Sequence, residues 1–273
     1  MNRFYIQFVL FLLSIFTYAN NKTLATETPA PEEETKTKTK TKQKPKKEYP
    51  TFEERCKKDN PIVCINPIIN AEAVELMEDA VKEFKYHATY IDGFERCPTY
   101  TDSYVRLHKK ELEDNTVEKI EHTIWGAENY EDIINEIWNS DRPKFFNAEI
   151  AKRKLVRVYN PNLVMIQQRY QTWYGAREKY FYALATKVEV TKYITMIVMM
   201  SVNVVDHHPS QKEYKNKLVE KANSFSTVID IEEGIRKGKF KKTFVNISGY
   251  YIQKYNQFVD VTFIASIDGH KCI

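Results

Sequence analysis

Successive β-rich runs joined by short turns fill most of the chain beyond residue 115, and they limit the possible folds more than any other feature. Asn160-Pro161-Asn162 and Asn256-Gln257 each separate two such runs, as the turn of a β-hairpin does. Short connections between consecutive strands require antiparallel pairing. The predicted strands of this sheet are Thr116–Trp125, Leu155–Tyr159, Leu163–Tyr170, Tyr180–Val190, Tyr193–Val205, Phe244–Tyr255 and Phe258–Ile267.

Two amphipathic helices are predicted, one ahead of the sheet and one within it. Asn66-Pro67 opens the first, Asn66–Tyr90, whose apolar face carries Val74, Met77, Val81, Phe84 and Ala88. The second has its stripe at Tyr130, Ile133, Ile134, Ile137 and Trp138. Because helices do not alternate with every strand, the fold class is α+β, and we expect the first helix outside the concave side of the sheet. Lys212–Asn223 is predicted to be irregular or helical, and a charged stretch, Glu232–Lys242, follows it.

Charge is distributed unevenly along the chain. The whole chain has 41 basic and 37 acidic side chains, of which residues 1–50 hold nine and five. Residues 51–273 therefore hold 32 of each and are neutral overall. A domain that binds nucleic acid usually carries its own excess of positive charge. We therefore expect no nucleic-acid partner, and the scarcity of glycine, with 7 residues, argues against a glycine-rich nucleotide site.

The N-terminus has the pattern of a secretory signal peptide. Arg3 precedes an apolar run from Phe4 to Tyr18, and Thr17-Tyr18-Ala19 places small residues at the cleavage positions. We predict a signal peptide at 1–19 and a secreted protein, with an uncleaved signal anchor as the alternative. Residues 20–50 then form a charged Lys/Thr-rich linker, predicted to be disordered, and 51–273 form the folded domain. The basic tract of the linker is a solvated spacer or a contact to anionic lipid head groups.

The four cysteines are Cys56, Cys64, Cys97 and Cys272. An even number in a secreted chain suggests disulfides, in any of three connectivities. There is no C-x-x-C pair with a nearby histidine, and His207 and His208 point to opposite sides if they end a strand. We expect no metal site and no cofactor.

One predicted strand is apolar on both faces. From Tyr193 to Met200 the residues do not alternate with polar ones. Such a strand is covered on both sides, as an ordinary core strand is, or lines an apolar cavity. Met196 and Met199 would suit an adaptable apolar surface.

One distinctive block of the chain is Val158-Tyr159-Asn160-Pro161-Asn162-Leu163-Val164-Met165-Ile166-Gln167-Gln168-Arg169-Tyr170. Further distinctive blocks lie at 4–7, 20–27, 75–81, 87–89, 92–97, 222–225, 235–239 and 264–268. In these blocks, and in their order, the chain resembles the fam-a proteins of malaria parasites, which are built on a START-like lipid-transfer domain. The resemblance covers nearly the whole chain.

This resemblance implies a helix-grip fold, in which a curved antiparallel sheet wraps around a long C-terminal helix and a lipid lies between them. It also implies a phosphatidylcholine-like ligand and export of the secreted protein to the host red cell. The sequence departs from the pattern at Gly269-His270-Lys271-Cys272-Ile273, where the printed chain stops without a segment for the closing helix. We therefore expect the lid helix to be missing and lipid retention to suffer.

Candidate lipid-binding residues follow from residue chemistry. Arg169 sits on an otherwise apolar or amide strand, and its guanidinium could hold a lipid phosphate if it faced inward; an outward or ion-paired arginine is the alternative. The remaining candidates are apolar or aromatic residues that would line the cavity: Trp138, Trp173, Tyr180, Tyr182, Met196, Val198 and Met199. The aromatic ones could cage a choline by cation–π contact, or they pack as ordinary core residues.

Two classes of function remain open at this point. The first is a lipid-binding or lipid-transfer protein, and the second is an exposed interaction or antigenic protein on the same scaffold. No G-x-S-x-G nucleophile motif is present. We do not expect an enzyme.

Overall fold

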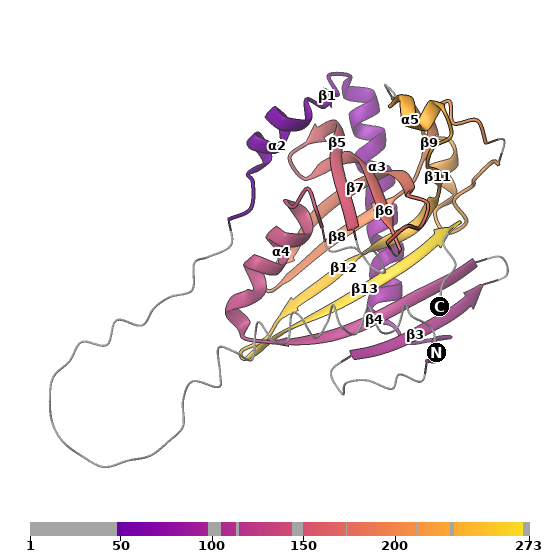
Figure 1. Ribbon diagram of the computed structural model, residues 1–273. Helices are drawn as coiled ribbons and strands as arrows, with labels where there is room; N and C mark the ends of the chain where they lie inside the picture. Colours follow the sequence, from indigo (N-terminus) through magenta and orange to yellow (C-terminus); the bar gives the residue numbers. More distant parts are fainter. Residues whose placement is uncertain are drawn as a thin grey trace, which may run out of the picture.

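The computed structural model describes residues 48–97, 105–112, 115–143, 150–172, 174–210, 212–229 and 232–269. The predicted signal peptide, nearly all of the linker, Trp173 and Cys272 lie outside the described residues. Figure 1 shows a curved sheet with helices on both of its faces.

The helices and strands follow one another in the order that an α+β chain predicts. The helical elements are α2 (Phe52–Asp59), α3 (Pro67–Thr89), η1 (Ala127–Asn129), α4 (Tyr130–Trp138), η2 (Glu220–Asn223) and α5 (Glu233–Arg236). The strands are β1 (Ile62–Val63), β2 (Glu95–Arg96), β3 (Val105–Leu112), β4 (Asn115–Trp125), β5 (Ile150–Asn160), β6 (Leu163–Gln171), β7 (Lys179–Thr191), β8 (Ile194–Met200), β9 (Asn203–Val205), β10 (Ser226–Val228), β11 (Lys241–Lys242), β12 (Phe244–Lys254) and β13 (Phe258–Asp268).

The sheet runs in the order β1-β5-β6-β7-β8-β12-β13-β4-β3-β2, and β11 pairs with β7. All long strands pair antiparallel, as predicted. The short strands β1 and β11 add parallel to β5 and β7, and β9 and β10 form a separate parallel pair. The sequence holds no pattern that predicts these parallel pairings, because each spans only two or three residues.

Local sequence accounts for the first helices. Thr51 and Glu54 form a capping box at the start of α2. Asn66 caps α3, and Pro67 occupies its first turn. The predicted helix is therefore confirmed, but its buried face is shifted: Val74 is 37% exposed, whereas the residues that pack are Ala73, Leu76, Met77, Ala80, Phe84, His87 and Ala88.

The two faces of the sheet each carry a hydrophobic cluster. We call them the α3 face and the α4 face after the helices that pack on them. On β6, Leu163 and Met165 lie on the α3 face, whereas Val164 and Ile166 lie on the α4 face. Figure 1 shows α3 passing behind the sheet, which curves around the side that holds α4. The expected position of the first helix outside the concave side is therefore confirmed.

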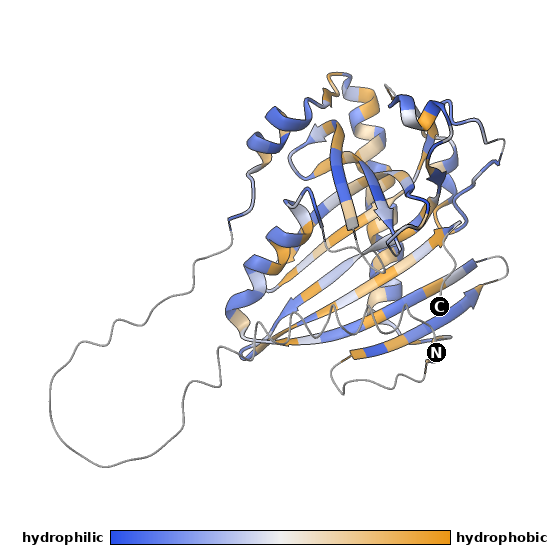
Figure 2. Cartoon of the chain, viewed as in Figure 1, coloured by the Kyte–Doolittle hydropathy of each residue, from blue (hydrophilic) through white to orange (hydrophobic). Residues whose placement is uncertain are grey.

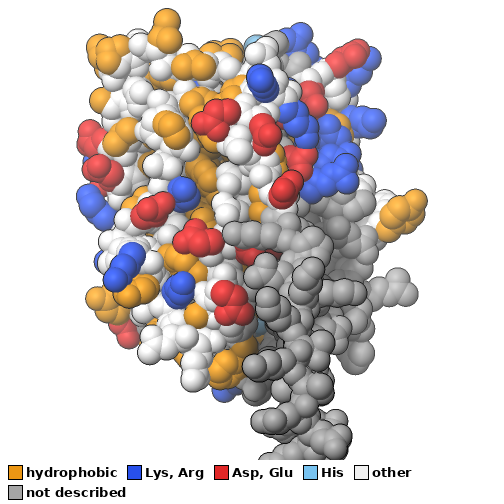
Figure 3. All heavy atoms as spheres, turned by 90° about the vertical axis from the view of Figure 1, so that its left-hand side faces the viewer, with side chains coloured by type: hydrophobic (Ala, Val, Ile, Leu, Met, Phe, Trp, Pro, Cys, Tyr) orange, Lys and Arg blue, Asp and Glu red, His pale blue; other side chains and the backbone are white. Residues whose placement is uncertain are grey.

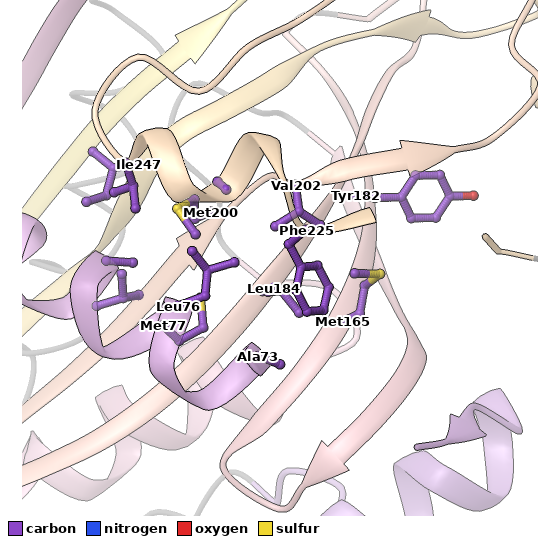
Figure 4. Packing of buried hydrophobic residues seen from close by; sticks show 14 of the residues in the cluster. Ala73, Leu76, Met77, Met165, Tyr182, Leu184, Met200, Val202, Phe225 and Ile247 are labelled. Carbon is purple, nitrogen blue, oxygen red and sulfur yellow. The ribbon is translucent and has the colours of Figure 1, made fainter. Parts of the chain in front are cut away.

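The α3 face is a closely packed core. Figure 4 shows side chains of α3, among them Leu76 and Met77, meeting residues of β7, β8 and β12. Gly249 of β12 allows this approach: a Cβ there would lie 2.2 Å from the Ile197 carbonyl oxygen and 3.0 Å from the Phe84 ring. Figure 2 shows hydrophilic and hydrophobic residues alternating along the outer strands β3 and β4.

One predicted strand proved to be two. Tyr193–Val205 was expected to be continuous, but β8 ends at Met200 and β9 begins at Asn203. The break occurs where the Ser201 hydroxyl donates to the Tyr182 carbonyl and accepts from the Val245 backbone amide. After β9, the chain lies over the α3 face, where Val219, Ala222 and Phe225 are buried.

Among the described residues, no helix is long and apolar enough to span a membrane.

Candidate functional site

The α4 face carries two buried arginines that no carboxylate among the described residues hydrogen-bonds. They are Arg153 on β5 and Arg55 on α2, which are 6% and 4% exposed. Arg153 lies between Lys152 and Lys154, which are both exposed. Because side chains alternate along a strand, the two lysines face water and Arg153 points inward.

Arg153 has only neutral partners among the described residues. Its Nε donates to Gln168 Oε1 at 3.0 Å, and its Nη1 donates to the Ile137 carbonyl at 2.6 Å. Its Nη2 lies 3.9 Å from Met199 Sδ. The α4 helix and the neighbouring strand thus position the guanidinium without neutralising its charge.

Arg55 is held in a similar way. Its Nη1 donates to the Trp138 carbonyl at 2.7 Å, at the end of α4. Its Nε and Nη2 are buried and have no hydrogen-bond partner among the described residues. Asp59 and Asp141 are close enough to raise its pKa, but burial outweighs them and the pKa is lowered overall.

The electrostatics of the pair favour an added anion. Burial, and then the charge of Arg55, lower the pKa of Arg153 to about 9. A buried cation without a counter-charge is costly, and a guanidinium loses its proton only in an environment that strongly disfavours charge. An anion placed against Arg153 would remove this penalty and form charge-assisted hydrogen bonds.

Further unpartnered groups lie on the same face. Gln168 Nε2 and Ser248 Oγ are both buried, and neither has a hydrogen-bond partner in the part of the chain that the structure describes. Gln168 is the residue that Arg153 Nε contacts, and Ser248 pairs in register with Met199. Together with Arg55 they offer unused donors to an acceptor-rich group.

The surroundings of these polar groups are apolar. The α4-face cluster includes Trp138, Tyr170, Phe181, Met199, Val245 and Phe263. Figure 3 views the molecule from the side of α2 and α4, where hydrophobic side chains show through among polar and charged ones. Cationic donors set in an apolar surface suit a ligand with an anionic head and an apolar body.

The predicted site residues do not form one group. Trp138 and Met199 lie on the α4 face with the arginines. Trp173 lies outside the described residues. The other candidates lie on or beside the α3 face: Arg169, Tyr180, Tyr182, Met196 and Val198.

The expectation that Arg169 points into the cavity does not match its position. Its Nε and Nη2 each donate to Glu178 at 2.8 Å, its Nη1 lies 3.2 Å from Glu232, and its guanidinium stacks on Phe240 at 4.1 Å. These contacts raise its pKa, chiefly through the hydrogen bond to Glu178. The strand pleat puts Arg169 on the side opposite Tyr170, so the ion-paired alternative applies.

The predicted tyrosines are tied into the core. Tyr180 donates to Asp206 at 2.9 Å, and the same carboxylate pairs with Lys242 at 2.9 Å. The Tyr182 hydroxyl accepts a hydrogen bond from Gln167 Nε2 at 2.9 Å. Burial raises the pKa of Tyr182 to about 12. Both hydroxyls are therefore already occupied within the protein.

Strand alternation also separates the residues predicted on β8. Met196 and Val198 pack on the α3 face, whereas Met199 packs on the α4 face. A single cavity on one face cannot be lined by all three. The strand is apolar on both sides because both faces of the sheet are covered, which was the ordinary-core alternative.

Metal and cysteine chemistry find no support in the described ranges. No group of three or more metal-ligating side chains is present there. His208 Nε2 contacts the Phe240 carbonyl at 3.0 Å, and His207 adopts a positive φ of 45° in the turn after β9. Cys56, Cys64 and Cys97 are free thiols. The disulfides suggested by the cysteine count are therefore not formed among these three.

Comparison with solved structures identifies the architecture. The chain superposes on human StAR-related lipid transfer protein 5 with a TM-score of 0.51 and 10% sequence identity, over 74% of this chain and 85% of that one. The fold is START-like. Human STARD10 also matches, with a TM-score of 0.44 and 14% identity, over 70% of this chain and 67% of that one.

The START-like sheet agrees with the predicted α+β helix-grip class. Its last described element is β13, which follows β12 at the C-terminal end of the sequence. No family model and no curated protein match the sequence. Membership of the fam-a family therefore stays a prediction.

Sequence reasoning missed the two arginines for different reasons. The predicted strand began at Leu155, so Arg153 was not assigned to a strand, on which alternation turns the middle residue of Lys152-Arg153-Lys154 inward. Arg55 gave no such signal, because its burial depends on α2 packing against the end of α4, which is remote in sequence.

Proposed function

We propose that the protein binds a phospholipid on the α4 face, with the lipid phosphate held by Arg153 and Arg55. The observation that carries this proposal is the burial of Arg153 without a carboxylate partner among the described residues. A phosphate would supply the missing charge and accept from the unused nitrogens of Arg55. The START-like fold, shared with a protein named as a lipid transfer protein, supports a lipid as the ligand class.

The finer parts of the proposal rest on sequence. Phosphatidylcholine carries the phosphate that the arginines require, and Trp138 is an aromatic residue on the same face. The apolar run at 4–18 supports secretion, and the resemblance to fam-a proteins supports export to a host red cell. Binding or transfer needs no catalytic group, so the proposed activity is not enzymatic.

Native mass spectrometry of the purified full chain tests the proposal. We expect co-purified phospholipid with the wild type and a loss of at least about tenfold in Arg153→Met, since one charge-assisted contact contributes about 1.5–3 kcal/mol. Arg169→Met is the matched control, because it removes an arginine from the opposite face; its lipid content should not change.

Two outcomes would reject the proposal. A wild-type protein that is free of lipid and takes up none from added phosphatidylcholine would favour an interaction or antigenic role on this scaffold. Equal loss of lipid in Arg153→Met and Arg169→Met would show a general effect on folding instead of a head-group contact.

A further inference from the structure

The segment that joins α2 to α3 is apolar and exposed. From Asn60 to Asn70 the chain has no charged side chain, although 29% of all residues are charged. Within this segment, which we call the apolar loop, Ile62, Val63, Ile65 and Ile68 are 48%, 63%, 91% and 67% exposed. Clusters of exposed aliphatic residues are unusual on a soluble surface and mark contact sites.

The backbone of the apolar loop is held in place. Ile62 and Val63 pair with Arg157 and Val158 of β5, and the Cys64 amide donates to the Val158 carbonyl at 2.8 Å. The Asn66 side chain accepts from the Ile68 amide at 2.9 Å. Because these hydrogen bonds fix the main chain, the aliphatic side chains are presented to solvent by a formed structure.

The neighbouring surface includes an exposed apolar residue and a basic strand. Val228, which is 62% exposed, lies near β1, because its carbonyl accepts a hydrogen bond from Arg157 Nη2 at 3.2 Å. The adjacent strand β5 contains Lys152, Arg153, Lys154 and Arg157 and no acidic residue. Figure 1 shows β1 and the start of α3 at the top of the molecule, and Figure 3 shows hydrophobic side chains along the same upper end.

We propose that the apolar loop inserts into the surface of an anionic phospholipid bilayer, with Lys152 and Lys154 facing its head groups. The loop exposes aliphatic side chains without the Trp, Tyr and Arg that dominate protein–protein contacts. Aliphatic insertion combined with basic residues is the pairing that gives peripheral proteins stable membrane attachment. The lysine-rich tract at 36–47, which ends close to α2 in the sequence, adds positive charge of the same kind.

A local probe tests insertion in the full chain. Ile65→Trp places a fluorophore at the most exposed position, and Tyr255→Trp places one in the β12–β13 turn, where the tyrosine is 40% exposed. With vesicles of brominated phosphatidylcholine and phosphatidylserine, we expect the fluorescence added by Ile65→Trp to be quenched and that added by Tyr255→Trp to be unaffected. Equal quenching of both, or of neither, would overturn the proposal.

A second measurement separates this surface from the lipid site. Ile65→Asp combined with Ile68→Asp should weaken partition onto these vesicles by about tenfold or more, since it removes two insertable side chains. Tyr193→Asp, at another exposed position, should not. Binding of short-chain phosphatidylcholine should be equal in all three proteins. Loss of partition with intact short-chain binding supports membrane insertion, and unchanged partition overturns it whether or not the α4 face binds lipid.

Discussion

The two faces of the sheet treat charged side chains in opposite ways. On the α3 face, Arg169 pairs with Glu178 and Glu232, and Asp206 pairs with Lys242. On the α4 face, within the described ranges, Arg153 is bound only by neutral groups and Arg55 has two nitrogens without a hydrogen-bond partner. Both faces share the same strands and a comparable set of apolar residues.

This difference is the one expected between a finished core and the proposed lipid site. A core can keep a charge at low cost when it provides the counter-charge, as at Arg169. A protein that keeps an unneutralised arginine in an apolar face loses stability for it in the absence of a ligand. The comparison therefore predicts that variants on the α3 face affect folding, whereas variants at Arg153 affect binding.

The largest effect is expected for Phe84→Ala on the α3 face. Phe84 is fully buried, and truncating such a side chain lowers the free energy of unfolding by about 3–5 kcal/mol. Chemical denaturation measures the loss. Tyr86→Ala, on the same helix at a position that is 40% exposed, is the control and should cost far less. Similar losses in both variants would show that α3 is not a core helix.

Gly249→Ala should follow, at about 1–3 kcal/mol. The added Cβ meets a backbone oxygen at 2.2 Å, so the strand or α3 must move. Gly234→Ala makes a useful comparison, because there the nearest atom belongs to the Phe240 side chain, at 2.8 Å. Thermal melts should show the larger fall for Gly249→Ala. The reverse order would contradict the close approach of α3 to β12.

Substitution of Arg169 and of Arg153 should change the free energy of unfolding of the lipid-free protein by different amounts. Arg169→Met leaves Glu178 and Glu232 without their cation, and since Arg169 is partly exposed we expect a loss of about 1–2 kcal/mol. Arg153→Met removes an unneutralised charge but also the donor to two neutral acceptors, so the loss should be smaller than for Arg169→Met or absent. Urea titration of delipidated protein gives both values. A greater loss in Arg153→Met would remove the contrast between the faces.

The smallest expected effect is a pH dependence that belongs to Arg153. Its pKa is lowered on folding, so between about pH 9 and the usual arginine range the unfolded chain binds more protons than the folded one. The contribution of Arg153 to the stability of the lipid-free protein therefore rises with pH in that window, by less than about 1.4 kcal/mol per pH unit. The difference between wild type and Arg153→Met, measured from about pH 8 to about pH 10, isolates this contribution. A flat difference would mean that Arg153 is not desolvated.

Patterns within single segments predicted much of the fold. The helix from Asn66, the hairpin around Asn160-Pro161-Asn162 and the α+β class all follow from period and turn chemistry, and the structure has each of them. The face to which a strand residue points is harder to predict. Met199 and Val198 are adjacent and equally apolar, yet they pack on opposite sides, and only the placement of the helices distinguishes the sides.

The candidate site was predicted less well, for a physical reason. Arg169 follows two glutamines and Arg153 lies between two lysines, but neither pattern shows which has a counter-ion. What separates them is the presence of Glu178 and Glu232 near Arg169 and of α4 near Arg153. Glu232 is remote from Arg169 along the chain. Charge neutralisation is a property of the tertiary structure, so a sequence pattern alone could not identify which arginine lacks a counter-ion.

The position of β4 in the sheet has a consequence for how the chain folds. Residues 118–125 of β4 pair with residues 258–265 of β13, so an early strand finds its neighbour in the last one. Contacts between such distant segments slow folding, because the loop between them must be ordered first. During synthesis, β4 has no β13 to pair with until the end of the chain emerges, and during that interval its exposed backbone edge is open to mispairing.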